Sequence, residues 1–212
     1  MTTGPSAVVA AFEGPCCAGK TTLARLLAGV RGLTVTFIPC YADHAGGGRH
    51  LPAQEAHTVP EREEALRQLL AVEASRMARA RQDADIILAD RSVHTLLAHS
   101  YALQVMTGVG FLTPSVRLLR SSPIPAWPDL VFYLDLPHQA VADRNHGKFP
   151  PGSIYIDSQF NAAVRAYFVR LAAQNSPRLA WLDAMLDPAE LARHAETRLR
   201  QMVAPRDTQG TT

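Results

Sequence analysis

One short motif near the start of the chain constrains the fold more than any other feature of the sequence. Residues 14–21 read GPCCAGKT, which fits the pattern G-x-x-x-x-G-K-[ST]. The apolar run from Ala7 to Glu13 predicts a buried strand before the motif, and Lys20 to Ala28 predicts a helix after it. In this strand–loop–helix context the backbone N–H groups of the loop and the positive end of the helix bind phosphate.

Each residue type in the motif has a chemical reason to be there. The glycines allow the backbone to curl, so that successive N–H groups point at phosphate oxygens. Lys20 can place its ammonium near the β- and γ-phosphates, and Thr21 can place its hydroxyl on Mg²⁺. Cys16 and Cys17 are adjacent, which is not the C-x-x-C spacing of a redox pair. We expect the nucleotide to contact Gly14, Cys17, Ala18, Gly19, Lys20, Thr21 and Thr22.

Strand-like and helix-like segments alternate along the rest of the chain. Four further strands are expected at Leu33–Ile38, Asp85–Asp90, Leu130–Leu136 and Arg178–Asp183. Longer helices are expected at Glu61–Gln82, Ser92–Thr107, Ile156–Asn175 and Pro188–Val203. Alternation of this kind predicts an α/β fold with a five-stranded parallel sheet and helices on both faces, a three-layer arrangement.

The remaining segments are read as connections. Cys40 to Pro60 is rich in glycine and proline and predicts a mobile loop, and Thr113 to Pro128 predicts an irregular, proline-rich stretch. We expect one domain over residues 1–203, with a small lid at about 144–155 and a flexible tail over 204–212.

The composition excludes several classes of protein. The chain has 21 basic and 19 acidic residues, a balance that gives no reason to expect binding to nucleic acid or to an acidic membrane. No apolar stretch approaches the roughly 20 residues that span a bilayer. Three cysteines provide no disulfide framework, so we expect a cytoplasmic protein.

A carboxylate and a base follow the third predicted strand. Asp90 and Arg91 come directly after the apolar run from Ile86 to Ala89. In a parallel sheet this end of the strand lies beside the phosphate loop. Asp90 could orient Mg²⁺ or accept a proton from a hydroxyl, and Arg91 could neutralise charge on a phosphoryl group in transfer.

Taken together, these pieces resemble the thymidylate kinases and their relatives, the deoxynucleoside kinases. The similarity runs in order through FEGPCCAGKTT (residues 12–22), DRS (90–92), FYLDLP (132–137) and RAYFVRLA (165–172). The resemblance implies a P-loop kinase fold, with ATP and Mg²⁺ as cofactors and a small molecule as phosphoryl acceptor. It also implies a homodimer formed through helices such as Glu61–Gln82 and Ser92–Thr107.

The resemblance also assigns roles to single residues. Lys20, Asp90, Arg91 and Arg144 match catalytic residues of these kinases, with Thr21 and Asp90 at the metal. Arg144 enters the lid over the donor nucleotide, and Lys148 could assist there. On the acceptor side we expect Arg76, Arg91, His94, His99 and Asp43.

The acceptor side departs from both groups of kinases. Thymidylate kinases commonly have a carboxylate where this chain has Cys16, and tyrosine where it has Ser92. Nucleoside kinases have an acid where this chain has Leu96. The sequence therefore predicts phosphoryl transfer to a thymidylate-like nucleotide, and it leaves open a nucleoside or nucleoside-like acceptor. A regulatory P-loop NTPase is a third alternative, although no N-K-x-D motif is evident.

Overall fold

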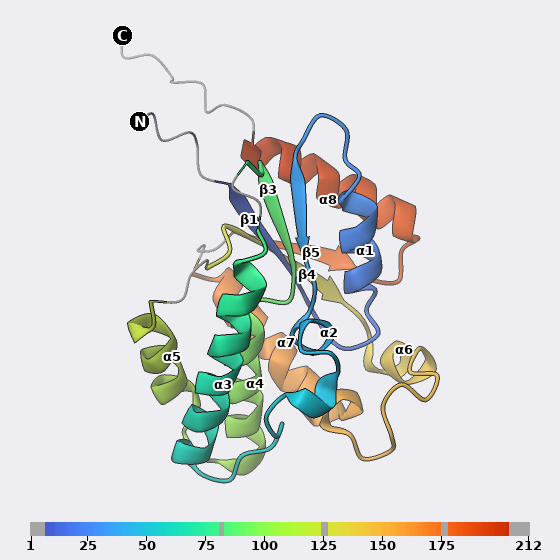
Figure 1. The fold of residues 1–212 in the computed structure, drawn as a ribbon. Helices are drawn as coiled ribbons and strands as arrows, with labels where there is room; N and C mark the ends of the chain where they lie inside the picture. Colours follow the sequence, from blue (N-terminus) through green and yellow to red (C-terminus); the bar gives the residue numbers. More distant parts are fainter. Residues whose placement is uncertain (1–6, 81–82, 124–126, 175–177, 204–212) are drawn as a thin grey trace.

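The computed structural model describes four stretches of the chain, residues 7–80, 83–123, 127–174 and 178–203. Five parallel strands form one sheet in the order β2-β3-β1-β4-β5 (Figure 1). They are β1 (Val8–Glu13), β2 (Val35–Ile38), β3 (Ile86–Asp90), β4 (Leu130–Asp135) and β5 (Arg178–Asp183). The predicted α/β fold with a five-stranded parallel sheet is confirmed.

Helices cover both faces of this sheet. They are α1 (Lys20–Leu27), α2 (Tyr41–His44), α3 (Val59–Met77), α4 (Val93–Thr107), α5 (Leu112–Ser121), α6 (His138–Asp143), α7 (Ser158–Ala172) and α8 (Pro188–Val203). Two short 3₁₀ turns, η1 (Gly48–His50) and η2 (Ile154–Ile156), complete the described elements. Helices α1 and α8 lie together on one side, while α3, α4 and α5 gather at the lower left of Figure 1.

Alternation along β4 divides the core between the two faces. Phe132 and Leu134 pack with α1 and α8, whereas Val131 and Tyr133 pack with α3, α4 and α7. Successive side chains of a strand point to opposite faces, and here both faces are buried. This is why β4 reads as a continuous apolar run in the sequence.

Two predicted connections contain helix. The expected irregular stretch from Thr113 to Pro128 is wrong in its first half, because α5 spans Leu112–Ser121. Pro114 is the third residue of α5, in the first turn, where backbone N–H groups have no partner within the helix and proline removes nothing. The expected loop from Cys40 to Pro60 includes α2, η1 and the first two residues of α3.

Some boundaries also shift. Helix α3 ends at Met77 rather than at Gln82, and Gln82 itself lies outside the described residues. The end of the predicted helix at Asn175 and the predicted tail over 204–212 also lie outside them. The predicted lid, residues 144–155, comprises the connection after α6 and the first two residues of η2, and its role as a lid stays a prediction.

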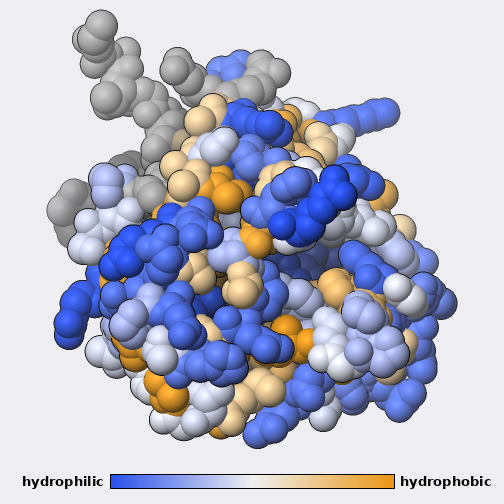
Figure 2. Space-filling view, turned by 60° about the horizontal axis from the view of Figure 1, so that its bottom comes forward, coloured by the Kyte–Doolittle hydropathy of each residue, from blue (hydrophilic) through white to orange (hydrophobic). Residues whose placement is uncertain are grey.

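The surface of the protein is mixed. On the face shown in Figure 2, polar residues cover most of the area, apolar residues form small separate patches, and the centre is hollowed. Among the helices of the described residues, none combines the length and the apolar character that crossing a membrane requires.

Candidate active site

The loop between β1 and α1 has a backbone that few residues can adopt. Gly14, Cys17 and Gly19 have φ angles of 129°, 63° and 90°. A Cβ atom at Gly14 would lie 2.4 Å from the carbonyl oxygen of Leu134, so only glycine fits against the end of β4. Gly19 caps α1 without a side-chain hydrogen bond. The first N–H groups of α1 are therefore left without a side-chain acceptor, an arrangement that suits an anion.

Lys20 lies inside this loop. Its side chain is only 6% exposed, and Nζ donates hydrogen bonds to the carbonyl oxygens of Gly14 at 3.2 Å and Pro15 at 2.6 Å. Burial, together with the charge of Arg91, lowers the pKa of Lys20 to about 8. Lys20 has no carboxylate in hydrogen-bonding contact among the described residues, so its buried ammonium is stabilised when an anion binds beside it. The residue fits a phosphate site.

Thr21 and Asp90 meet across the loop. The Thr21 hydroxyl donates a short hydrogen bond to Oδ2 of Asp90, which joins the start of α1 to the end of β3. A hydroxyl and a carboxylate are suitable Mg²⁺ ligands, and Mg²⁺ usually takes the rest of its shell from water and substrate phosphates. Within the described part of the chain, no group of three or more His, Cys, Asp or Glu side chains could hold a metal alone. The two residues therefore fit a metal that arrives with a nucleotide.

Arg91 follows with a left-handed backbone, φ 71°. Its N–H donates to the carbonyl of Phe12 at 3.0 Å, and Nη2 lies 3.6 Å from Sγ of Cys16. Burial lowers the pKa of Arg91, but the neighbouring Cys16, Glu13 and Asp90 outweigh it, so the net shift is upward. Arg91 is thus a permanent positive charge beside the phosphate loop.

Glu13 is a residue of this site that the sequence reading missed. Its buried carboxylate accepts hydrogen bonds from Ser92 N at 2.9 Å, Ser92 Oγ at 2.7 Å and Thr95 Oγ1 at 2.5 Å. Burial raises its pKa, although the hydrogen bonds and the charge of Arg91 oppose the shift. The carboxylate ties the end of β1 to the first turn of α4. The sequence feature that could have indicated its role is its position at the end of a strand, directly before Gly14.

Arg76 is buried near the end of α3. It is 0% exposed and pairs with Glu73 at 2.5 Å. It also donates to the carbonyl oxygens of Pro39 (2.8 Å), Asp90 (2.9 Å) and Arg91 (3.1 Å). Its guanidinium therefore holds the backbone that carries Asp90 and Arg91, and its contact with a nucleobase stays a prediction.

The two histidines of α4 point in different directions. His94 shares a 2.9 Å hydrogen bond with the Tyr167 hydroxyl and faces Trp127, so the structure places it in a groove beside α5 and α7. His99 Nε2 lies 2.6 Å from the carbonyl oxygen of Gln54, and its ring packs against those of Tyr155 and Phe160.

His99 belongs to a buried polar region. Burial, with the charges of Arg62 and Arg91, lowers its pKa to about 3, so it is neutral at pH 7. Arg62 was not singled out from the sequence; it is buried and donates to Ser100 Oγ and to the Leu96 carbonyl, both at 2.9 Å. Burial lowers the pKa of Arg62 to about 10.

The other predicted residues lie toward the rim. Asp43 is exposed in the first turn of α2, where its N–H donates to Sγ of Cys40 at 3.5 Å. Thr22 is exposed on α1, one residue after Thr21. Arg144 ends α6 and donates to the carbonyl of Ala184 at 3.0 Å, whereas Lys148 is exposed with its ammonium 5.6 Å from the Phe149 ring centre. Arg144 therefore links the start of the predicted lid to the turn after β5.

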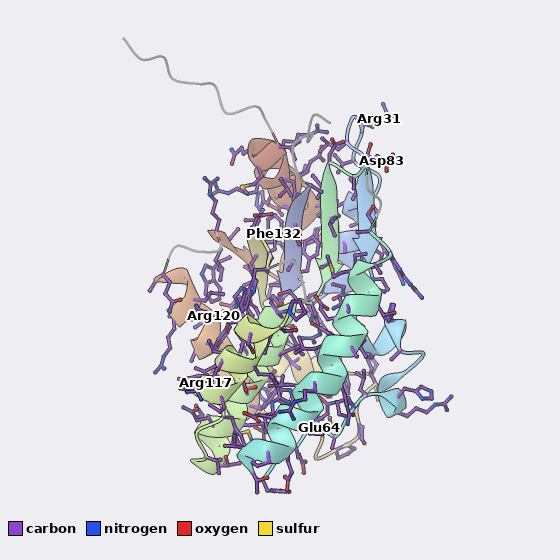
Figure 3. All side chains as sticks on the ribbon, turned by 60° about the vertical axis from the view of Figure 1, so that its left-hand side comes forward. Arg31, Glu64, Asp83, Arg117, Arg120 and Phe132 are labelled. Carbon is purple, nitrogen blue, oxygen red and sulfur yellow. The ribbon has the colours of Figure 1, made fainter. Side chains whose placement is uncertain are left out.

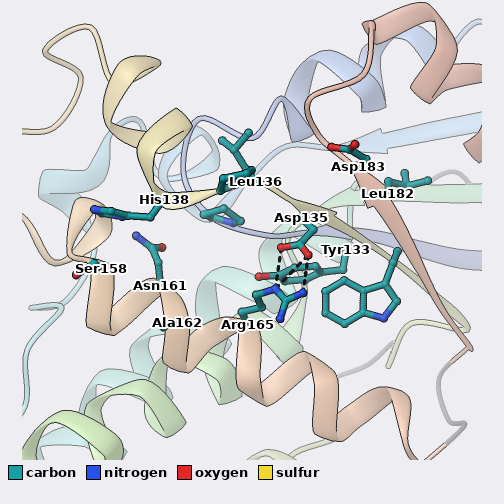
Figure 4. Close-up of a pocket in the computed structure, with 13 residues that line it drawn as sticks. Tyr133, Asp135, Leu136, His138, Ser158, Asn161, Ala162, Arg165, Leu182 and Asp183 are labelled. Atoms are coloured by element: carbon teal, nitrogen blue, oxygen red, sulfur yellow. Dashed lines mark hydrogen bonds and ion pairs between the residues drawn. The ribbon is translucent and has the colours of Figure 1, made fainter.

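A cavity of about 570 Å³ adjoins the loop through Pro15, at the ends of β4 and β5 (Figure 4). Arg165 from α7 enters it, pairs with Asp135 at 2.8 Å and lies 5.3 Å from the ring centre of Trp181. The basic group of this cavity is thus already paired with a carboxylate, unlike Lys20.

Comparison with known proteins bears on this geometry. A sequence profile described as AAA domain matches residues 9–167, which is most of the chain. The chain belongs to this family. Among curated proteins, none matches the sequence significantly.

The arrangement of this AAA domain is that of a known kinase fold. The structure of thymidylate kinase from Candida albicans is similar to it with a TM-score of 0.68, covering 94% of each chain at 16% sequence identity. This likeness shows a thymidylate-kinase-like P-loop fold, with the phosphate loop at the carboxyl ends of the central strands.

Proposed function

We propose that this chain is a phosphotransferase that uses ATP and Mg²⁺, and that its acceptor is a thymidylate-like nucleoside monophosphate. One observation carries the proposal. Lys20 and Thr21 at the start of α1, with Asp90 and Arg91 at the end of β3, converge on one loop, where their charges and oxygens suit a metal-bound triphosphate. The fold shared with thymidylate kinase supports the class of acceptor.

Residues of the chain divide the work of transfer. The loop N–H groups and Lys20 hold the phosphates, while Thr21 and Asp90 hold the metal. The metal, when bound, neutralises charge on the phosphates. Arg91, Arg144 and Lys148 add positive charge along the path of the phosphoryl group. Residues 144–155 close over the donor and exclude water, which would otherwise hydrolyse ATP.

The acceptor decides whether a base is needed. A phosphate acceptor is already ionised at neutral pH and needs none. A hydroxyl acceptor must lose a proton, and Asp90, a carboxylate beside the phosphate loop, is the base we propose for it. The altered acceptor side, with Cys16 against Arg91, makes the nucleoside kinase the second function to test.

The assembly and location complete the proposal. We propose a homodimer in the cytoplasm, where the three free thiols of Cys16, Cys17 and Cys40 stay reduced. Sedimentation at micromolar concentration tests the dimer.

The deciding experiment is an ADP-release assay with ATP, Mg²⁺ and a panel of acceptors. The panel contains deoxynucleoside monophosphates, ribonucleoside monophosphates and free nucleosides. Strong turnover with dTMP or dUMP is the expected result. Turnover with nucleosides alone would favour the second function. ADP release that no acceptor stimulates would point to a regulatory NTPase.

A further inference from the structure

A second cavity lies away from the phosphate loop, between α4, α5 and α7. It is a groove of about 610 Å³ whose walls combine aliphatic side chains with the rings of Tyr101, Trp127 and Tyr167. Trp127 is 39% exposed, although a tryptophan is a costly side chain to leave in water. The groove therefore offers a planar molecule aromatic contacts on several sides.

An unsatisfied polar atom points to an occupant. His94 is only 2% exposed and lines the groove, yet its Nε2 has no hydrogen-bond partner among the described residues. Its Nδ1 is already used by Tyr167. Burial lowers the pKa of His94 to about 4, so the ring is neutral at pH 7 and Nε2 carries one hydrogen-bonding position. Buried polar atoms are nearly always paired, and a bound molecule would pair this one.

The charged side chains that line the groove are all positive. Arg120 from α5, labelled in Figure 3, and Arg170 from α7 both line it, and the lining includes no Asp or Glu. Neither arginine forms a salt bridge with a carboxylate of the described residues. Arg170 lies over Tyr101, 4.9 Å from the ring centre. Two guanidinium groups that have no carboxylate partner among the described residues, at an aromatic groove, complement a negative charge on the occupant.

We propose that the groove between α4, α5 and α7 binds a small aromatic anion, a planar ring system that carries a carboxylate, sulfonate or phosphate. The ring lies among Tyr101, Trp127 and Tyr167, and the acidic group meets Arg120 and Arg170. A polar atom of the ring system pairs with His94 Nε2. This site is separate from the phosphate loop, and its test does not depend on whether phosphoryl transfer occurs.

Two dyes that differ in one group provide the probes. 1-Anilinonaphthalene-8-sulfonate is an aromatic anion, and N-phenyl-1-naphthylamine is the same ring system without the sulfonate. The chain has two tryptophans, so Trp181→Phe leaves Trp127 as the one donor of energy transfer to a bound dye. We expect saturable transfer from Trp127 to the sulfonate dye, and binding of the neutral dye about tenfold weaker because it lacks the charged hydrogen bonds.

Variants locate the dye. Arg120→Gln and Arg170→Gln should each weaken binding of the sulfonate dye about tenfold. Arg117→Gln is the matched control, because Arg117 is exposed on the same helix and does not line the groove. His94→Phe keeps a ring and removes Nε2, so it should also weaken binding. Circular dichroism of each variant confirms that it is folded.

Three results would overturn the proposal. Equal affinity of the two dyes would remove the role of the negative charge. Equal affinity of the arginine variants and the Arg117 control would place the dye elsewhere. Displacement of the dye by ATP with Mg²⁺ would place it at the phosphate loop. Persistence of dye binding under saturating ATP is the expected result.

Discussion

The two halves of the candidate site are built in different ways. The donor half, made of the phosphate loop with Thr21 and Asp90, depends on backbone conformation and on contacts between adjacent strands. The predicted acceptor half, to which α3 and α4 contribute side chains, depends on residues far apart in the sequence. In it, Arg76 and His99 are bonded to protein groups rather than left open. Distant relatives can share the backbone geometry of the donor half, whereas the side chains of the acceptor half differ according to the acceptor.

Asp90 is the residue that we assign to both halves, so its substitution tests the division most directly. Asp90→Asn should lower turnover by about 10²-fold with a monophosphate acceptor, through weaker metal binding, and by about 10⁴-fold with a hydroxyl acceptor, because a base is lost as well. The measurement is kcat on both acceptor types. Equal losses would show that Asp90 belongs to the donor half alone.

Lys20 tests the donor half without the acceptor. Lys20→Ala should reduce kcat/KM by about 10²- to 10³-fold, because a buried positive charge no longer meets the phosphates. Arg25→Gln, on the exposed side of α1, is the control and should leave the rate within about twofold. A Lys20→Ala protein with undiminished kcat/KM would contradict the assignment of the phosphate site.

Helix α3 carries a buried and an exposed ion pair that sharpen the contrast. Glu73→Gln leaves the Arg76 guanidinium buried without its carboxylate, and it should lower the free energy of unfolding by about 3 kcal/mol. Glu63→Gln breaks the exposed pair with Arg67 and should cost less than about 1 kcal/mol. Urea unfolding compares the two. Similar losses would mean that burial does not make the Glu73–Arg76 pair more costly to break than the exposed Glu63–Arg67 pair.

The smallest expected effect is the uptake of a proton by Lys20 when ATP binds. Because the pKa of Lys20 is about 8 in the free protein, Lys20 is largely neutral at pH 9. Bound phosphates favour the charged form and raise the pKa, so ATP binding should take up a proton at pH 9. ATP affinity should fall by up to about tenfold per pH unit above pH 8. Calorimetry in buffers of different ionisation enthalpy measures the uptake. At pH 7, where Lys20 is already protonated, none is expected.

The features that could be predicted from the sequence belong mainly to the donor half of the site and to the sheet. The five strands and the phosphate loop were predicted because their signals are local: apolar runs, two glycines and a lysine at fixed spacing. Helix α5 was missed because Pro114 and the prolines after it resemble a break, although proline is harmless in a first turn.

Tertiary context decided the rest. A sequence cannot show that Arg76 turns inward to three carbonyl groups, or that His94 bonds to Tyr167 while His99 bonds to the Gln54 carbonyl. Glu13 was read as the last residue of a strand, because its partners Ser92 and Thr95 lie 79 and 82 positions away. Each of these contacts depends on how helices pack.

The bond network of Glu13 limits what can be transplanted from this protein. Residues 14–21 contain every residue of the motif, which suggests that this segment could be transferred to another protein by itself. If residues 13–21 were moved into another scaffold, Glu13 would bring a buried carboxylate and leave behind the three donors of Ser92 and Thr95 that satisfy it. The smallest unit that keeps these hydrogen bonds therefore comprises β1, the loop and the first turn of α4. These are two separate segments of the chain, and exchanging either one alone would separate Glu13 from its donors.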